Sequence, residues 1–327
     1  RMSRPEQVSS KLAAQSFPFV LEGALGEGAS GRVWAARDAT GRAVAIKVSA
    51  SPHGAELCSE AERLLFAGSR ALTNLLDAGR VPAGVAALVD RVGHAWIALE
   101  RAPGAAVVPS LLRAGERAGV LWAVARDVGE ALSDLHRAGL AHGDVKPENI
   151  VVESSASGPS ARLVDLGLSS RSDEAVPRGA TLRYLAPEAC LPGAHGDARA
   201  RDLFALGIAL AEIASAKVAA ASDPARAAGE AALPADVAAV IGALLAPAPG
   251  ARPGAAWVRK RALEALGRDD PVAARIERRR RAVERSYLAV RRREIVACAT
   301  SREVRIEVTG APAQWLGRAA DLTQKLA

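Results

Sequence analysis

The chain has 327 residues, with 43 Lys and Arg against 36 Asp and Glu, and so a formal charge of +7. Half of the residues are hydrophobic and only 3% are aromatic, which excludes a wholly disordered chain and predicts a core of Ala, Leu and Val. The length suggests roughly two domains, or one large domain with an appendage. Cys58, Cys190 and Cys298 are too far apart for a disulfide framework or a Cys-x-x-Cys metal clip, which favours a reducing compartment.

The apolar stretches of the sequence argue against export and membrane insertion. The first residues lack the apolar core of a secretory signal. The longest apolar run, residues 203–221, contains Glu212 and Lys217, and a membrane-spanning helix would not readily carry both charges. We therefore expect a cytoplasmic protein without a transmembrane segment.

Strand-like alternation, broken by glycine clusters, dominates the first hundred residues. The expected strands are residues 20–25, 32–37, 42–48, 85–89 and 95–99. Residues 56–67 carry Leu57, Ala61 and Leu64 at helical spacing. This part of the chain therefore predicts a five-stranded antiparallel sheet with one inserted helix.

Helical periodicity replaces this pattern after residue 104. The expected helices are residues 120–138, 203–216, 235–245 and 255–266, and the Ala- and Pro-rich residues 219–234 and 246–254 are expected to connect them. Strands followed by helices predict an α+β protein with two lobes.

A glycine-rich run joins the first two expected strands, with Gly26, Gly28 and Gly31 in the pattern Gly-x-Gly-x-x-Gly. A dinucleotide-binding run would instead lead from a strand into a helix. Alone, such glycines usually serve the geometry of a turn. Lys47, sixteen residues after Gly31, lies inside an apolar strand. A lysine in such a place needs either a carboxylate or a phosphate as its partner.

Three further motifs follow in order: H-G-D-V-K-P-E-N at residues 142–149, D-L-G at 165–167 and A-P-E at 186–188. With the glycine run and Lys47, they resemble the signatures of the bacterial, eukaryotic-like serine/threonine protein kinase family. Any one of these residues would more often be a turn residue or a helix cap. The order of several spaced motifs carries the resemblance, which covers about residues 17–266.

The resemblance implies a bilobal fold, with a small five-stranded antiparallel β lobe that includes one helix and a larger, mainly α-helical lobe. The expected division is an N-terminal extension (residues 1–16), the small lobe (17–102), the large lobe (103–267) and a basic C-terminal extension of unrecognised type (268–327).

The implied activity is transfer of the ATP γ-phosphoryl group, with Mg²⁺ as cofactor, to a Ser or Thr hydroxyl of a protein, including the chain itself. The residues expected to bind ATP are Gly26, Gly28, Gly31, Val33, Ala45, Lys47, Glu100 and Ala102. The glycine amides and Lys47 would bind phosphates, and Glu100 and Ala102 would offer backbone groups to adenine. Asn149 and Asp165 supply the oxygen ligands that Mg²⁺ prefers.

Asp144 and Lys146 are the expected catalytic pair. Asp144 would accept or orient the proton of the substrate hydroxyl, and Lys146 would neutralise the phosphoryl group in transfer. The Asp-x-Lys pattern and Thr181 resemble serine/threonine kinases more than tyrosine kinases. Glu60 and Glu62 could each pair with Lys47, but they cannot share a helix face, and the spacing along the chain favours Glu60.

Three other charged residues resemble structural sites of the family. Asp202 corresponds to a buried aspartate that anchors the catalytic loop, and Glu188 and Arg252 correspond to an ion pair that ties the large lobe together. One departure is Gly143, which replaces an arginine that binds a phosphorylated activation segment. We therefore expect residues 169–183 to need no phosphorylation for activity.

Two other classes of function remain alternatives. A pseudokinase, which binds ATP and partners without turnover, usually lacks the lysine or a metal ligand, whereas Lys47, Asp144, Asn149 and Asp165 are all present. The H-G-D triplet also resembles small-molecule kinases of the aminoglycoside type, but these lack the remaining motifs as a set.

The positive charge is concentrated in the C-terminal extension. Residues 268–327 contain 14 basic and 8 acidic side chains, a difference of +6, and nine arginines lie between Arg275 and Arg293. Residues 275–293 predict an amphipathic helix that docks on the large lobe and has a solvated basic face. The sharper alternative is that it binds an acidic partner, which could be a protein, a nucleic acid or an anionic membrane surface.

Overall fold

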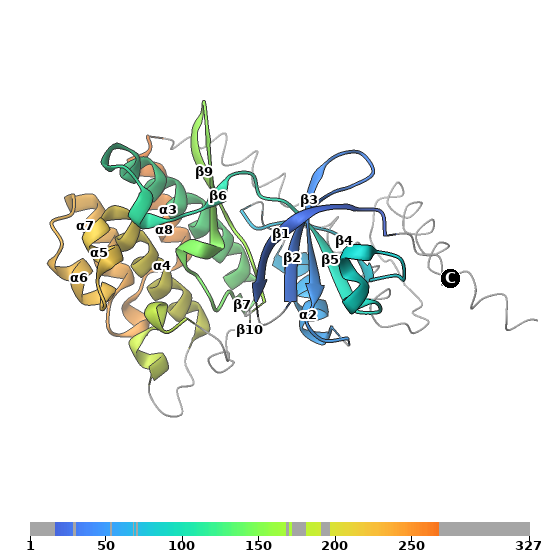
Figure 1. Ribbon diagram of the computed structural model, residues 1–327. Coiled ribbons are helices and arrows are strands. Elements are labelled where there is room, and N and C mark those ends of the chain that lie inside the picture. Colours follow the sequence, from blue (N-terminus) through green and yellow to red (C-terminus); the bar gives the residue numbers. More distant parts are fainter. Residues whose placement is uncertain are drawn as a thin grey trace, which may run out of the picture. The chain divides into compact units, whose positions relative to one another are not determined.

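The structure is a computed structural model, and it describes residues 17–28, 31–52, 54–67, 69, 71–167, 170–171, 181–190 and 197–267. These residues form two compact units (Figure 1). The first holds the described residues up to Phe66 together with Asn74–Arg101, and the second holds Ala67–Thr73 and the described residues from Ala102 on. Both expected extensions, including the basic segment of residues 275–293, lie outside the described residues.

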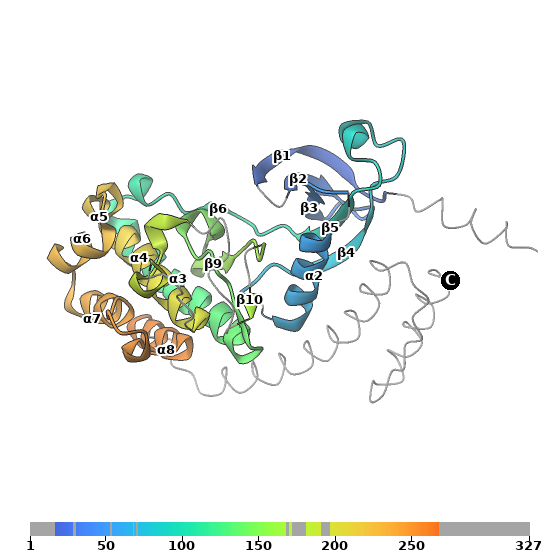
Figure 2. The ribbon, with the colours of Figure 1, turned by 90° about the horizontal axis from the view of Figure 1, so that it is seen from below.

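The first unit is built on a five-stranded sheet in which every neighbouring pair is antiparallel, in the order β1-β2-β3-β5-β4. The strands are β1 (Val20–Gly28), β2 (Gly31–Arg37), β3 (Ala43–Ser49), β4 (Leu75–Arg80) and β5 (Ala95–Glu100). One helix, α2 (Ala55–Ala67), follows β3 (Figure 2). The predicted small β lobe with one helix is therefore confirmed.

Alternation along β3 separates the hydrophobic core from Lys47. The side chains of β3 that are fully buried in this core are Val44, Ile46 and Val48. Because successive side chains of a strand point to opposite faces, Ala45 and Lys47 lie on the other face of the sheet. The strand thus presents one lysine on the face opposite the core.

Aromatic rings complete the core. Trp96 of β5 is buried, and Phe17 and Phe19, which precede β1, contact its ring edge-on at centroid distances of 5.6 and 5.4 Å. Leu88, from the connection between β4 and β5, packs into the same cluster. Three of the scarce aromatic rings, those of Phe17, Phe19 and Trp96, are therefore gathered at one place in this unit.

The expected strand at residues 85–89 is wrong. A 3₁₀ segment, η2 (Ala86–Arg91), occupies this region, and β4 supplies the fifth strand instead. Leu88 is buried while Val89 is exposed, so a single side chain of the turn reaches the core. Asp77 and Gly79 are poor strand formers, but pairing with β5 decides the conformation of β4.

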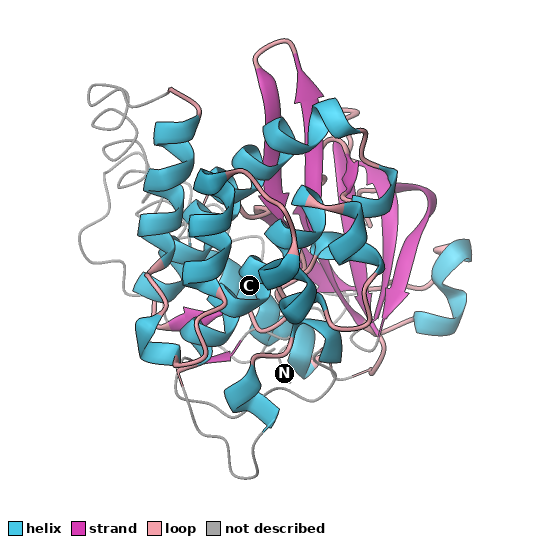
Figure 3. Ribbon diagram, turned by 90° about the vertical axis from the view of Figure 1, so that its left-hand side faces the viewer, coloured by secondary structure: helices cyan, strands magenta, loops and turns pink. Residues whose placement is uncertain are grey.

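The second unit is mainly α-helical (Figure 3). Its helices are α3 (Ala114–Arg137), α4 (Ala198–Ala214), α5 (Ala216–Ala220), α6 (Pro224–Glu230), α7 (Ala235–Leu244) and α8 (Ala255–Ala265). Its strands are β6 (Ala105–Ala106), β8 (Ile150–Ser155) and β9 (Gly158–Leu163) in one sheet, and β7 (Leu140–Ala141) and β10 (Ser170–Arg171) in another. Its 3₁₀ segments are η3 (Pro109–Leu111), η4 (Pro147–Asn149), η5 (Leu182–Tyr184), η6 (Pro187–Cys190) and η7 (Pro249–Ala251). The predicted helical lobe is confirmed.

Helix α4 forms the centre of this unit, and nearly all of its side chains are buried. A Cβ atom built at Gly207 would lie 2.9 Å from the Leu244 Cβ and 2.9 Å from the Leu245 Cδ2, closer than real side chains approach. Only glycine therefore allows α4 to lie this near to α7.

Caps account for two departures from the expected helices, the early start of α4 and the presence of α6. Helix α4 begins at Ala198, five residues early, since the Asp197 side chain accepts a hydrogen bond from the Arg199 backbone N–H at 3.0 Å. The expected connection at residues 219–234 contains α6, whose first turn has Pro224 and is capped by Asp223. Within the described ranges, no helix has the length and apolar character to cross a membrane.

Candidate active site

Lys47 and Glu60 form a buried ion pair in the first unit. The Lys47 Nζ atom lies 2.7 Å from the Glu60 Oε2 atom, and the two side chains are 4% and 1% exposed. Glu60 belongs to α2, and Glu62, two residues further on, is partly exposed. The structure thus places Lys47 against the glutamate that the sequence favoured. A buried lysine held by one carboxylate is a fixed positive charge.

Strand register places the expected adenine-binding and phosphate-binding residues on the same face of the sheet. Val33 of β2 is directly opposite Lys47 of β3, and Gly26 of β1 is opposite Val33. Directly opposed residues of antiparallel strands share a face, and Ala45 is two residues from Lys47, so these four residues lie on one side. That side is the one opposite the hydrophobic core.

The glycine-rich hairpin requires glycine at Gly31. Gly31 has φ +148°, and a Cβ atom there would lie 2.0 Å from the Val48 carbonyl oxygen. Gly28 pairs with Gly31 at the end of the two strands, and residues 29–30 lie outside the described residues. The hairpin is held by Glu27, whose carboxylate accepts hydrogen bonds from Arg32 at 2.8 Å and Arg91 at 3.3 Å.

The two residues expected to offer backbone groups to adenine fall in different units. Glu100 ends β5 in the first unit, where its side chain accepts a hydrogen bond from Asn74 at 2.6 Å and lies 3.5 Å from Arg42. Ala102 belongs to the second unit. Neither contact of the Glu100 side chain uses its backbone carbonyl, which is the group expected to face adenine.

Asp144 is the centre of the polar cluster in the second unit. Its Oδ2 atom lies 2.6 Å from Lys146 Nζ and accepts a hydrogen bond from Asn149 Nδ2 at 3.0 Å. Its Oδ1 atom accepts a hydrogen bond from the Thr181 hydroxyl at 3.0 Å, and Lys146 also donates to that hydroxyl at 3.0 Å. Both carboxylate oxygens are therefore oriented by donors, and one of these donors is an alcohol.

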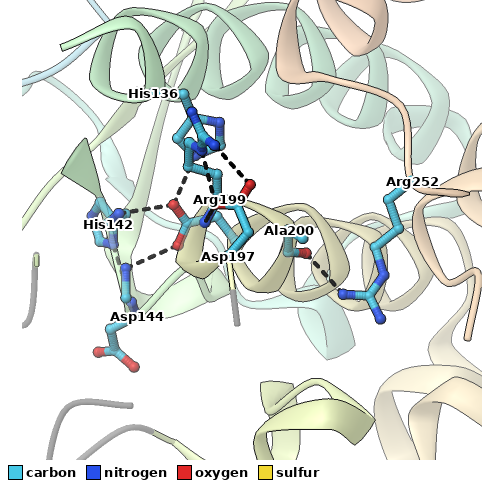
Figure 4. Close-up of polar contacts among 9 residues, drawn as sticks. His136, His142, Asp144, Asp197, Arg199, Ala200 and Arg252 are labelled. Carbon is cyan, nitrogen blue, oxygen red and sulfur yellow. Dashed lines mark hydrogen bonds and ion pairs between the residues drawn. The ribbon is translucent and has the colours of Figure 1, made fainter. Parts of the chain in front are cut away.

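Asp202 of α4 holds the backbone on which Asp144 lies. Its carboxylate accepts hydrogen bonds from the backbone N–H groups of His142 at 2.8 Å and Gly143 at 2.9 Å (Figure 4). The His136 Nε2 atom lies 2.9 Å from the same carboxylate, a contact that the sequence did not reveal. Gly143 has φ +82°, which a glycine adopts without strain. The expected anchoring contact is present.

His142 is a buried, neutral part of this framework. Its side chain is fully enclosed, and its Nε2 atom lies 3.2 Å from the Val164 carbonyl oxygen. Burial lowers the pKa of His142 below its ordinary value, although Asp202 and other carboxylates act to raise it. The imidazole is therefore uncharged at neutral pH.

Asn149 and Asp165 are brought to neighbouring positions by the backbone. The Val164 N–H donates to the Asn149 carbonyl at 2.9 Å, which places Asp165 one residue away from this contact. Asp165 has φ +65°, and its Oδ1 atom accepts from the Gly167 N–H at 3.1 Å. Since the Asn149 amide nitrogen donates to Asp144, its amide oxygen is the atom that can bind a cation.

These two side chains fit a magnesium ion that takes its other ligands from elsewhere. Among the described residues, no group of three or more His, Cys, Asp or Glu is arranged to hold a metal. Mg²⁺ is commonly bound by one or two carboxylates together with water and substrate phosphates. The donor set of one carboxylate and one amide oxygen therefore suits Mg²⁺ that arrives with a phosphate.

Glu188 and Arg252 form the expected structural pair. The two guanidinium nitrogens of Arg252 lie 2.6 and 2.8 Å from the two Glu188 oxygens. Arg252 also donates to the Ala200 carbonyl at 3.0 Å (Figure 4). Burial acts to raise the pKa of Glu188, but the Arg252 hydrogen bonds and charge hold it below its ordinary value. The pair ties η6 to the segment before α8.

Glu212 is a buried carboxylate whose partners were not predicted. It lies in the apolar helix α4 and accepts hydrogen bonds from the Tyr184 hydroxyl at 3.0 Å and from Arg183 Nε at 2.6 Å. The signal available in the sequence was the charge itself, because a glutamate inside an apolar helix needs a donor. The sequence could not identify which donor reaches it.

Known proteins resemble the chain across the region that contains these residues. The protein kinase domain family matches residues 19–233, which is more than half of the chain. The serine/threonine-protein kinase AfsK of Streptomyces coelicolor is 37% identical over 160 residues, covering 47% of this chain and 18% of that protein. AfsK of Streptomyces griseus is 33% identical over 220 residues, covering 63% of this chain and 25% of that protein.

A third relative is the probable serine/threonine-protein kinase PkwA of Thermomonospora curvata, 33% identical over 215 residues, which cover 61% of this chain and 26% of that protein. The chain thus spans about a quarter or less of the length of these relatives. The family match contains the paired Lys47 and Glu60 as well as the cluster around Asp144. The chain belongs to the protein kinase family.

Proposed function

We propose that this protein is a serine/threonine kinase, which transfers the γ-phosphoryl group of ATP to a Ser or Thr hydroxyl of a protein and can phosphorylate itself. The observation that carries the proposal is the contact between the Thr181 hydroxyl and the Asp144 carboxylate at 3.0 Å. It shows that an alcohol fits against this carboxylate at hydrogen-bond distance. The family membership and the names of the relatives support the same reaction.

Asp144 and Lys146 would act on the acceptor hydroxyl. Lys146 and Asn149 hold one carboxylate oxygen of Asp144, so the group has a fixed direction and needs no reorganisation to accept a proton. The Lys146 ammonium, 2.6 Å from Asp144, also places a positive charge where the phosphoryl group would arrive. The proton of the substrate hydroxyl would move to an Asp144 carboxylate oxygen.

Lys47 would bind the ATP phosphates, with its ammonium fixed by Glu60. Val33 and Ala45 share its face of the sheet and offer apolar contacts to adenine, and Gly26, Gly28 and Gly31 offer backbone amides close to phosphate oxygens. The backbone of Glu100 and Ala102 would contact the adenine edge. These roles are carried over from the family onto the matching residues.

Asn149 and Asp165 would bind Mg²⁺ through one oxygen atom each. When bound, this ion neutralises part of the negative charge on the phosphate oxygens.

Gly143 lacks the side chain that would bind a phosphorylated segment, which supports activity without phosphorylation of residues 169–183. The basic residues between Arg275 and Arg293 would recruit an acidic partner. Cys58 and Cys190 are free thiols, which supports a cytoplasmic location.

Incubation with labelled ATP and Mg²⁺ tests this function. Wild-type protein should label itself and dephosphorylated casein, whereas Asp144→Asn and Asp165→Ala should each lose at least about 100-fold in rate. Both variants should keep a wild-type unfolding midpoint. ATP binding without label above that of Asp165→Ala would instead identify the protein as an ATP-binding scaffold.

A further inference from the structure

Arg183 makes an unusually complete set of hydrogen bonds next to the cluster around Asp144. Its guanidinium donates to Glu212 Oε1 at 2.6 Å and to the backbone carbonyls of Ala221 at 2.6 Å, Ala219 at 2.9 Å and Val218 at 3.3 Å. The Arg183 side chain is 29% exposed and the Glu212 side chain is 4% exposed. Most of the N–H groups of this one guanidinium therefore donate to α4 and to the end of α5.

These carbonyls belong to the end of α5. The last carbonyls of a helix have no partner within the helix, and a cation near them is favoured by the helix dipole. Arg183 donates to the Ala219 and Ala221 carbonyls and to the buried Glu212 carboxylate of α4 with one planar group, and it adds a longer bond to the Val218 carbonyl, which also accepts from the Ala221 N–H at 3.1 Å. A lysine has the same charge, but it lacks the fork that can reach both places at once.

The turn that carries Arg183 also carries Thr181. Within η5, the Tyr184 N–H donates to the Thr181 carbonyl at 3.0 Å, and the Tyr184 hydroxyl donates to Glu212 at 3.0 Å. Leu182 is 82% exposed, so its side chain adds little packing to hold the turn. Arg183 and Tyr184 thus fasten the turn to the same carboxylate, while Thr181 at its start contacts Asp144.

We propose that Arg183 is a positioning residue, which holds the Thr181 hydroxyl against Asp144 and Lys146 by tying η5 to α4 and α5. Its effect on phosphoryl transfer rests on the proposed function, but its effect on the position of Thr181 does not. The inference follows from the contacts at both ends of η5, since the turn connects a helix end on one side with the Asp144 carboxylate on the other.

Arg117 provides a matched control. It also donates to backbone carbonyls, those of Ile213 at 2.8 Å, Pro109 at 3.0 Å and Glu212 at 3.5 Å, and it is part-buried at the same end of α4 but does not touch the Glu212 carboxylate. It comes from α3, however, and none of these hydrogen bonds reaches η5. Arg117→Met should therefore remove comparable hydrogen bonds without releasing Thr181.

Hydrogen exchange tests the position of the turn without requiring activity. In Arg183→Met, the amides of Tyr184 and Leu185, which donate to the Thr181 and Leu182 carbonyls, should exchange about tenfold faster or more. In Arg117→Met, they should stay within about twofold of wild type. Equal exchange at these amides in wild type and Arg183→Met, or equal acceleration in both variants, overturns the proposal.

A double-mutant cycle with Thr181→Val tests whether Arg183 acts through Thr181. Arg183→Met should lower kcat on dephosphorylated casein by about 30-fold in the wild-type background, with KM for ATP unchanged, because small displacements of catalytic groups are costly. In the Thr181→Val background, the same change should cost less than about twofold. Losses that are equal in the two backgrounds would show that Arg183 serves stability alone.

Arg183→Lys keeps the test decisive if Arg183→Met does not fold. The lysine can still pair with Glu212 but releases the α5 carbonyls, so its exchange and kcat should lie between those of wild type and the Met variant. A wild-type protein that labels neither itself nor casein contradicts the proposed function. In that case the exchange rates still decide whether Arg183 fixes the turn.

Discussion

Glu60 and Lys47 form an ion pair from which water is almost excluded, since their side chains are 1% and 4% exposed. Removing one partner of such a pair leaves a charge in a poorly solvated place, so the lysine must move or lose its proton. Glu62 lies on the same helix but is partly exposed. The two glutamates therefore offer a direct comparison of a buried, paired carboxylate and a partly exposed one on the same helix.

Glu60→Gln should lower kcat/KM for ATP by about 10- to 100-fold, because Lys47 loses the carboxylate that fixes its ammonium. Glu62→Gln should stay within about twofold of wild type. Steady-state kinetics with varied ATP measure both variants. Similar losses in the two variants, or a larger loss for Glu62→Gln, would mean that the ion pair has no part in ATP use.

The Glu188–Arg252 pair should make the stability of the protein depend on pH. Arg252 holds the pKa of Glu188 low, so the stabilisation is complete above the unfolded-state pKa of about 4.3 and is lost as the pH falls through the lower folded pKa. Glu188→Gln should destabilise the protein by about 3–5 kcal/mol at pH 7, because Arg252 is then buried without its carboxylate. The difference from wild type should shrink below pH 4.

Urea unfolding at pH 7 and at pH 3.5 measures this difference. Glu230→Gln is the control, because Glu230 pairs with Arg226 on the exposed helix α6 and both side chains are more than half exposed. An exposed pair of this kind contributes about 0–1 kcal/mol. A Glu188→Gln variant that unfolds with the wild-type midpoint at pH 7 contradicts the structural role of the pair.

At the level of elements, two glycine-to-alanine substitutions in α4 and α7 should change the stability of the protein in opposite directions. Gly207→Ala adds a Cβ atom 2.9 Å from Leu244 and Leu245, which should cost about 1–3 kcal/mol and outweigh the gain in helix propensity. Gly242→Ala, on the exposed side of α7, adds a Cβ atom that meets nothing within 4 Å. It should stabilise the protein by about 0.5–1 kcal/mol.

Thermal unfolding of the two variants beside wild type measures both effects. The opposite signs separate crowding between helices from helix propensity, which is the same for both substitutions. Stabilisation by Gly207→Ala would show that α4 and α7 can move apart at little cost. Destabilisation by Gly242→Ala would show that its surroundings are more crowded than the contacts indicate.

The sequence predicted the elements whose signals are local. Alternation in β3 identified the strand that carries Lys47, and the order of short motifs identified Asp144, Asn149 and Asp165. It missed β4, because Asp77 and Gly79 are poor strand residues that only pairing with β5 makes extended. It also missed α6, where the cap at Asp223 outweighs an Ala- and Pro-rich composition.

The contacts that hold the site were harder to predict because they join residues far apart in the chain. His136 contacts Asp202 across 66 positions, and Arg183 reaches Glu212 across 29. The residues around His136 and Arg183 in the sequence do not predict which distant side chain each one contacts. Family resemblance supplied the anchoring role of Asp202, but the arginine that fastens η5 became visible only with the folded backbone.

For the whole molecule, charge is distributed unevenly along the chain. Residues 1–267 hold 29 basic and 28 acidic side chains, whereas the remaining residues hold 14 and 8. Any binding to an acidic polymer should therefore depend on the C-terminal extension and weaken as salt screens the charges. The expected site residues all lie in the nearly neutral part.

Replacing the nine arginines between Arg275 and Arg293 with glutamine should make the protein elute from immobilised heparin at a clearly lower salt concentration. ATP turnover on casein should stay within about twofold of wild type, because the expected site residues lie elsewhere. Replacing four exposed arginines of the second unit is the control, and the variant proteins should unfold at the same temperature. Unchanged elution of the nine-residue variant would rule out this segment as an acid-binding surface.

The aromatic cluster around Trp96 provides an intrinsic optical probe. Phe17 and Phe19 pack edge-on against this indole, and both precede or begin the family match at residue 19. Trp96 emission therefore reports whether the first unit is folded, including Phe17 and Phe19 at its start. Trp122 and Trp257 report whether the second unit is folded. With single-tryptophan variants, one denaturant titration can follow the melting of each unit separately and reveal whether ATP couples the two.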